Sequence, residues 1–88
     1  MLILAYRDTC PYCVKFKPIW NKFKKKYENV IDIREVDVTK QPDVSADLGV
    51  KGVPAIILVN GGKVVFKGER TLENLEKFVK ENMNSKTT

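Results

Sequence analysis

The periodic pattern of apolar residues between Pro11 and Tyr27 is the feature that most constrains the fold of this chain. Its apolar residues recur at three- and four-residue spacing with lysines between them, which predicts an amphipathic helix. Pro18 is expected to kink this helix without ending it. The short apolar run Leu2–Tyr6 just before it predicts a buried strand, and the sheet built on that strand can cover the helix stripe. The stripe consists of Phe16, Ile19, Trp20, Phe23 and Tyr27.

The rest of the chain alternates between strand and helix patterns. We expect the first two strands to be parallel through a right-handed crossover and the last two to form a hairpin at Asn60-Gly61. The pattern predicts an α/β fold with the order β-α-β-α-β-β-α and a central four-stranded mixed sheet flanked by helices. The later elements are a strand over 30–38, a helix over 42–48 ended by Gly49, strands over 55–59 and 63–67, and a helix from Leu72 capped by Thr71.

Length and composition indicate one globular domain. The chain has 88 residues, of which 43% are hydrophobic and 31% charged, a balance typical of soluble proteins. We expect a single domain over residues 1–83 and a flexible tail over 84–88. The apolar start is cut short by Tyr6-Arg7-Asp8, so it predicts neither a secretory signal nor a membrane span. A cytoplasmic monomer is the resulting expectation.

The net charge of +5 comes largely from lysines of the long predicted helix. Such a cluster can attract acidic partners. However, no groove-reading motif or series of stacking aromatic residues accompanies the lysines, so nucleic-acid binding is not expected. We interpret the cluster as a solvated helix face.

The chain contains two cysteines, Cys10 and Cys13, at the start of the predicted helix. Unpaired backbone N–H groups at a helix N-terminus stabilise negative charge, so Cys10 should ionise more readily than a free thiol. Side chains three residues apart on a helix are close enough to form a disulfide after small adjustment. The spacing therefore predicts a reversible pair, in which the Cys10 thiolate attacks a substrate disulfide and Cys13 resolves the mixed disulfide.

Two other interpretations of the cysteine pair are weaker. A structural disulfide is disfavoured in the cytosol, and its loop is too short to restrict the unfolded chain strongly. Structural zinc usually needs four ligands, whereas the chain offers two cysteines and no histidine. We therefore predict no metal site within one chain.

Together, the strand, the Cys10-Pro11-Tyr12-Cys13 motif, the helix and a later Val53-Pro54 resemble the thioredoxin superfamily. The resemblance covers residues 2–83. It implies that Pro54 is cis and lies beside the cysteines, and that the backbone of Val53 pairs with an extended substrate. The substrate-binding residues that it implies are Arg7, Pro11, Tyr12, Val53 and Pro54.

Thr9–Cys13 resembles the active site of one branch of this superfamily, the glutaredoxins. That branch implies no tightly bound cofactor and glutathione as a reductant. Arg7 would contact a glutathione carboxylate, Tyr12 would line the groove, and Val53 and Thr71 would complete the contacts.

Pro18 and the segment 49–54 instead resemble the thioredoxins. Leu4, however, stands where thioredoxins carry a buried aspartate, and Glu35 stands where they carry a lysine. The chain thus combines features of both branches. The position of Leu4 implies that the proton-relay carboxylate of thioredoxins is absent.

The resulting expectation is a dithiol oxidoreductase that reduces protein disulfides, with ribonucleotide reductase among the substrates that the resemblance implies. Its electrons would come from glutathione or from a thioredoxin reductase. The alternative is a dimer that binds an iron–sulfur cluster through Cys10 and external thiols. A catalytically idle interaction module is a third interpretation, against which the intact cysteines and Val53-Pro54 argue.

Overall fold

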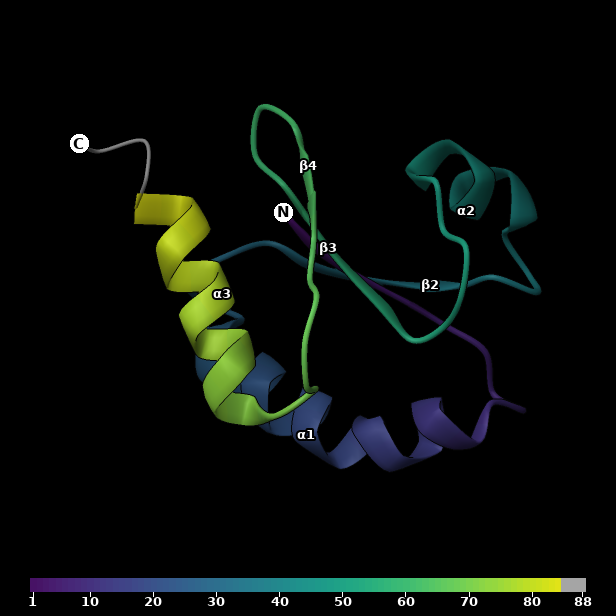
Figure 1. Ribbon diagram of the computed structural model, residues 1–88, viewed down its shortest axis with the longest axis horizontal. Helices are drawn as coiled ribbons and strands as arrows, with labels where there is room; N and C mark the ends of the chain where they lie inside the picture. Colours follow the sequence, from purple (N-terminus) through teal and green to yellow (C-terminus); the bar gives the residue numbers. More distant parts are fainter. Residues whose placement is uncertain (85–88) are drawn as a thin grey trace.

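The computed structural model describes residues 1–84 and has a four-stranded sheet flanked by helices (Figure 1). The strand order is β2-β1-β3-β4, in which β1 is parallel to β2 and antiparallel to β3, and β3 is antiparallel to β4. This confirms the predicted α/β fold and mixed sheet. The elements are β1 (Leu2–Tyr6), α1 (Pro11–Tyr27), β2 (Ile33–Asp37), α2 (Pro42–Leu48), β3 (Ala55–Val59), β4 (Lys63–Val65) and α3 (Leu72–Asn84).

Both outer strands are shorter than predicted. The amides of Val30 and Ile31 both donate to the carbonyl of Tyr27, at 2.9 and 3.0 Å, so the chain is still turning out of α1 where the sequence pattern predicts strand. At the other edge, β4 ends at Val65, although the Phe66 amide donates once more to the Ile56 carbonyl at 2.8 Å. The alternating hydrophobicity predicted that these two strands exist, but it did not predict the residues at which their pairing with the neighbouring strands begins and ends.

The prediction of a flexible tail over residues 84–88 is wrong at residue 84. Helix α3 continues through Asn84, so residue 84 is helical. Residues 85–88 lie outside the described part of the chain, and so does the rest of the prediction of a flexible tail. Within residues 1–84, no helix is both long and apolar enough to cross a membrane.

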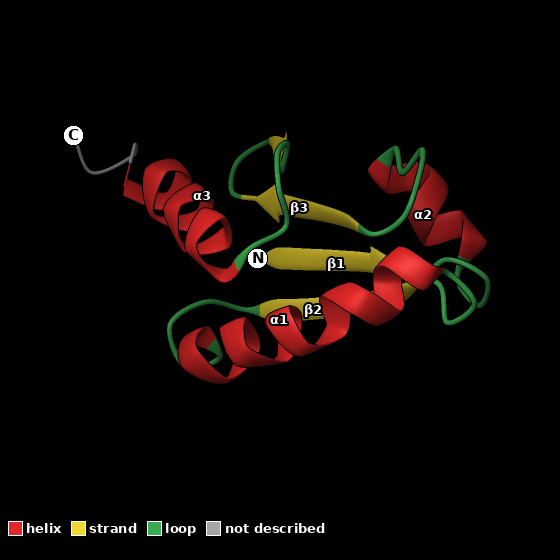
Figure 2. Ribbon diagram, turned by 60° about the horizontal axis from the view of Figure 1, so that its bottom comes forward, coloured by secondary structure: helices red, strands yellow, loops and turns green. Residues whose placement is uncertain are grey.

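The main core lies between one face of the sheet and the helices α1 and α3, which pack beside each other (Figure 2). Leu2 and Leu4 of β1 point into this core, whereas Ile3 and Ala5 point to the opposite face, because side chains alternate along a strand. Both pairs are buried, as expected for a strand covered on both faces. Residues of the core cluster are Leu2, Leu4, Phe16, Trp20, Phe23, Ile31, Ile56, Leu58, Leu75 and Val79.

The apolar stripe of α1 forms a continuous row of aromatic rings. Trp20 stacks with Phe23 at a centroid distance of 6.0 Å, and Phe23 stacks with Tyr27 at 4.7 Å. The helix runs without a break past Pro18, which lies on its exposed side. Burial of the rings can offset the backbone hydrogen bond that the proline ring removes.

Two helix boundaries follow the predicted signals. Gly49 ends α2 in the left-handed region, with φ 73°, a conformation that favours glycine. At the start of α3, the hydroxyl of Thr71 accepts a hydrogen bond from the amide of Asn74 at 3.1 Å, which confirms the predicted N-cap. In the β3–β4 turn only Gly61 has positive φ, so the Asn60-Gly61 signal placed the hairpin correctly although Asn60 does not adopt that conformation.

Candidate active site

Strand β1 and helix α1 place the two cysteines at one end of the sheet. Cys10 is the N-cap of α1, and its amide donates to the carbonyl of Arg7 at 3.1 Å, which closes the turn between the two elements. Pro11 occupies the first helical position, where the missing N–H costs nothing because that group has no partner within the helix. The motif is therefore well suited to start a helix directly behind Cys10.

The Cys10 thiol is only 7% exposed, and its sulfur lies 3.6 Å from the carbonyl oxygen of Val53. The backbone N–H of Cys13 is the main group that holds the pKa of Cys10 below its usual value. The Cys13 thiol, the backbone N–H of Tyr12 and the charge of Arg7 act in the same direction, against the effect of burial. The helix start thus favours the Cys10 thiolate, as predicted.

Cys13 lies one turn further along α1 and is 8% exposed. Burial is the main cause that raises the pKa of its thiol, and interaction with Cys10 adds to this. Both cysteines are free thiols. The two positions therefore differ in the way a nucleophile and a resolving thiol must differ: one ionises easily and the other stays protonated.

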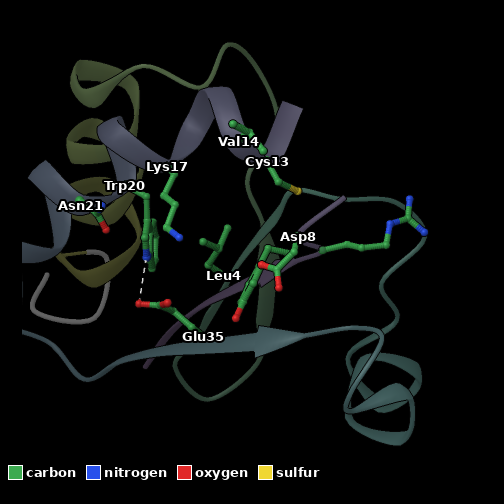
Figure 3. Close-up of a pocket in the computed structure, with 10 residues that line it drawn as sticks. Leu4, Asp8, Cys13, Val14, Lys17, Trp20, Asn21 and Glu35 are labelled. Atoms are coloured by element: carbon green, nitrogen blue, oxygen red, sulfur yellow. Dashed lines mark hydrogen bonds between the residues drawn. The ribbon is translucent and has the colours of Figure 1, made fainter. Parts of the chain in front are cut away.

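A cavity of about 220 Å³ lies beside Cys13, under the first turns of α1 (Figure 3). Leu4 forms part of its wall, at the position that the resemblance linked with a missing carboxylate. The carboxylates of Asp8 and Glu35 nevertheless line the same cavity. Glu35 is held there by Lys24 at 2.8 Å and by the indole N–H of Trp20 at 3.4 Å, and Figure 3 shows the second of these two hydrogen bonds. Lysine and indole donors lower the pKa of Glu35, so it is ionised at neutral pH.

The sequence did not predict this cavity. Trp20 was interpreted only as part of the apolar stripe, although its ring also carries an N–H that bonds Glu35. The register of β1 with β2 places Leu4 opposite Glu35, and this pairing is not part of the sequence prediction. A buried tryptophan usually finds a partner for its N–H, and that rule is the signal that could have suggested an acceptor on β2.

The other predicted site residues are divided between two concave surfaces. Arg7 lines the cavity beside Cys13, whereas Tyr12 lines a separate groove between α1 and the loop before α3. Thr71 uses its hydroxyl to cap α3. Two of the predicted glutathione contacts, Arg7 and Tyr12, therefore lie on different concave surfaces, and the glutathione contacts as a set stay a prediction.

Val53 and Pro54 lie at the entrance to β3. The peptide bond between them is cis, as the resemblance implied. The contact between the Val53 carbonyl and the Cys10 sulfur brings this loop beside the motif, although the two are far apart in sequence. The backbone next to Pro54 thus borders the Cys10 thiol.

This arrangement agrees with a comparison to known families, in which the family model for thioredoxin matches residues 1–81. The chain belongs to the thioredoxin family. Among curated relatives, the thioredoxin of Borreliella burgdorferi is 39% identical over 81 residues, covering 86% of this chain and 69% of the relative. Protein disulfide-isomerase of Saccharomyces cerevisiae is 34% identical and matches 93% of this chain, which spans only 17% of that relative.

Other relatives are also much longer than this chain. Bloodstream-specific protein 2 of Trypanosoma brucei brucei is 34% identical and matches 99% of this chain, which spans 18% of it. Among solved structures, the J-Trx1 fragment of ERdj5 superposes with a TM-score of 0.89 at 24% identity, covering 99% of this chain and 43% of the fragment, and shows the same fold. Matches to thioredoxin and disulfide isomerase support thiol–disulfide oxidoreductase activity in general.

We expect Cys10 to react with iodoacetamide at lower pH than Cys13, because only the thiolate is alkylated and the pKa of Cys10 is the one that is lowered. Labelling of the reduced protein, mapped by mass spectrometry across a pH series, measures both midpoints. The Cys10 midpoint should fall below about 8.5, the ordinary cysteine value. In urea the two midpoints should converge. Equal midpoints in the folded protein would contradict the assignment of the two roles.

Proposed function

We propose that the protein reduces disulfides of other polypeptides through a Cys10–Cys13 dithiol. The observation that supports this most directly is the opposite shift of the two thiol pKa values within one helical turn. A low pKa provides a thiolate for attack, and a high pKa keeps the second thiol from competing for the substrate. The Val53 carbonyl beside the Cys10 sulfur offers an edge of backbone along which an extended substrate can lie.

The reaction has two exchange steps. The Cys10 thiolate attacks one substrate sulfur, which breaks the substrate disulfide, forms a mixed disulfide and releases the other substrate sulfur as a thiolate that takes a proton from water. Cys13 then loses its proton and attacks the Cys10 sulfur, which releases the second substrate thiol and leaves a Cys10–Cys13 disulfide. Two electrons pass from the protein to the substrate.

The cavity beside Cys13 gives the second step a route for the proton. A volume of about 220 Å³ holds several water molecules, since each occupies about 30 Å³ in the liquid. Water in this cavity can accept the proton that Cys13 must lose, close to the carboxylates of Asp8 and Glu35. Cys13 can therefore be buried from the substrate side and still exchange its proton with solvent.

We further propose that a thioredoxin reductase, rather than glutathione, returns the electrons. Two observations support this choice: the family match is to thioredoxin, and two of the predicted glutathione contacts, Arg7 and Tyr12, line different concave surfaces. The decisive experiment measures NADPH oxidation with a disulfide substrate in two parallel reactions. One contains thioredoxin reductase, and the other contains glutathione with glutathione reductase.

We expect turnover with thioredoxin reductase and little turnover with glutathione. The Cys10→Ser variant in both reactions gives the background rate. Turnover with glutathione alone would overturn the choice of electron source while leaving the dithiol mechanism intact. No turnover in either reaction, together with no single-turnover reduction of a peptide disulfide, would overturn the proposed function itself.

A further inference from the structure

The groove lined by Tyr12 has a chemical character that the dithiol mechanism does not use. It has a volume of about 130 Å³ and lies between α1 and the loop before α3. Tyr12, which is 65% exposed, connects the groove to the Cys10-Pro11-Tyr12-Cys13 motif. We call it the cationic groove, because two of its lining residues are basic and none is acidic; its lining residues are Tyr12, Lys15, Phe16, Ile19 and Arg70.

The two basic side chains of the cationic groove are free for a partner. Within residues 1–84, neither Lys15 nor Arg70 forms a hydrogen bond or an ion pair through its side chain. At the other end of α1 the situation differs, since Lys24 is paired with Glu35 and Lys26 with Glu76. The positive charges of Lys15 and Arg70 are therefore not neutralised by another side chain within residues 1–84.

An apolar floor with two cations at its rim is suited to a side chain that ends in a carboxylate. The rings of Tyr12 and Phe16 can pack against the aliphatic part of such a side chain. The guanidinium of Arg70 can donate two parallel hydrogen bonds to its carboxylate, and Lys15 adds a second charge. Two cations that face one small apolar groove also repel a basic side chain.

The reach of an extended substrate agrees with this occupant. Lys15 lies five residues after Cys10, or about 7.5 Å along the helix axis at 1.5 Å per residue. An extended polypeptide spans about 3.3 to 3.6 Å per residue. A substrate whose cysteine is bonded to Cys10 can therefore place a side chain two to four residues away over the groove.

We infer that the cationic groove binds an aspartate or glutamate side chain of the substrate polypeptide, located two to four residues from the reacting cysteine. The groove would thus make this protein selective for acidic sequences around a disulfide. The inference rests on the proposed function and adds a class of substrate to it. The occupant is an acidic residue of a polypeptide, and a carboxylate of glutathione is the competing source that the test must separate.

Single-turnover reduction of matched peptide disulfides tests this selectivity without a reductase. Three peptides carry glutamate, glutamine or lysine three residues from one cysteine and are otherwise identical. Reduced protein should reduce the glutamate peptide about threefold to tenfold faster than the glutamine peptide, as expected for one or two exposed ion pairs, with the lysine peptide slowest. High salt should diminish the difference, because it screens exposed charges.

Paired variants assign the effect to the groove. The double variant Lys15→Gln with Arg70→Gln should remove the preference for glutamate over glutamine. The double variant Lys22→Gln with Lys25→Gln loses the same charge from the exposed far part of α1 and should keep the preference. Arg70→Glu should favour the lysine peptide instead. Circular dichroism melts establish that each variant is folded before rates are compared.

Four results would overturn the inference, and the last of them would also overturn the proposed function. The first is equal reduction of all three peptides, which leaves the proposed function standing. The second is equal loss of preference in both double variants, which would assign the effect to net charge. The third uses oxidised glutathione as an additional substrate: a groove variant that changes its reduction but leaves the preference among the three peptides unchanged would assign the groove to a glutathione carboxylate. Failure to reduce any peptide would overturn both the inference and the proposed function.

Discussion

Replacing Cys10 with serine is expected to lower the rate of disulfide reduction by about a thousandfold or more, the scale seen when a nucleophile is removed. Serine keeps nearly the same shape at the start of α1, but its hydroxyl does not ionise near neutral pH and cannot form a disulfide. The groups that lower the pKa of Cys10, above all the backbone N–H of Cys13, remain in place without a thiolate to stabilise. The measurement is turnover of a disulfide substrate by the variant and by the wild-type protein.

Cys13→Ser is the matched control, because it also replaces one buried cysteine of the motif. It should keep the first step and lose the second, so a mixed disulfide between Cys10 and the substrate should accumulate and be visible by mass spectrometry without reducing agent. The proposed direction of attack would be wrong if the Cys10→Ser variant retained wild-type turnover. It would also be wrong if the Cys10→Ser variant formed the mixed disulfide on Cys13.

The parts of the fold that the sequence predicted well are those decided locally. The boundaries of β1 and α1 follow from a short apolar run, a turn and a helical stripe that Pro11 can start. Gly49 and Thr71 also marked helix ends through their own backbone or side-chain chemistry. The predicted start of β2 was wrong because the carbonyl of Tyr27 accepts hydrogen bonds from two backbone amides of the following turn. A hydrophobicity pattern does not show that a turn uses these amides in place of a strand.

The candidate site also has some features that the local sequence predicts and others that it does not. The difference between Cys10 and Cys13 follows from their positions on one helix start, so spacing alone could indicate it. The cis bond before Pro54 needed a family resemblance, since X-Pro bonds are mostly trans. The proximity of Val53 to Cys10 is a tertiary contact that only the packed sheet reveals.

The two concave surfaces beside the motif depend on elements that meet only in the folded protein. Glu35 reaches the cavity through the parallel register of β1 with β2, and Arg70 reaches the cationic groove through the packing of α3 against α1. Comparison with the thioredoxins placed Leu4 at the usual carboxylate position but did not show that Glu35 and Asp8 line the same space. Two carboxylates thus line the space beside Leu4, although neither comes from the strand that carries Leu4.

The largest loss of stability is expected from Phe23→Ala. Phe23 is fully buried in the core between the sheet and the helices, and its ring stacks between those of Trp20 and Tyr27. Removal of a buried phenylalanine ring costs about 3 to 5 kcal/mol, through lost burial and the cavity that remains. The free energy of unfolding of a typical domain is about 5 to 15 kcal/mol, so the variant should be close to the limit at which the protein still folds.

Urea unfolding followed by circular dichroism measures this loss, with the fluorescence of Trp20 as a second probe. Val30→Ala is the matched control, since Val30 is 68% exposed and its truncation should change the free energy of unfolding by no more than about 0.5 kcal/mol. Phe23→Leu should lie between the two, because leucine fills part of the same space. A Phe23→Ala variant as stable as Val30→Ala would show that the aromatic row of α1 does not carry the core, and that the packing of α1 over the sheet is supported elsewhere.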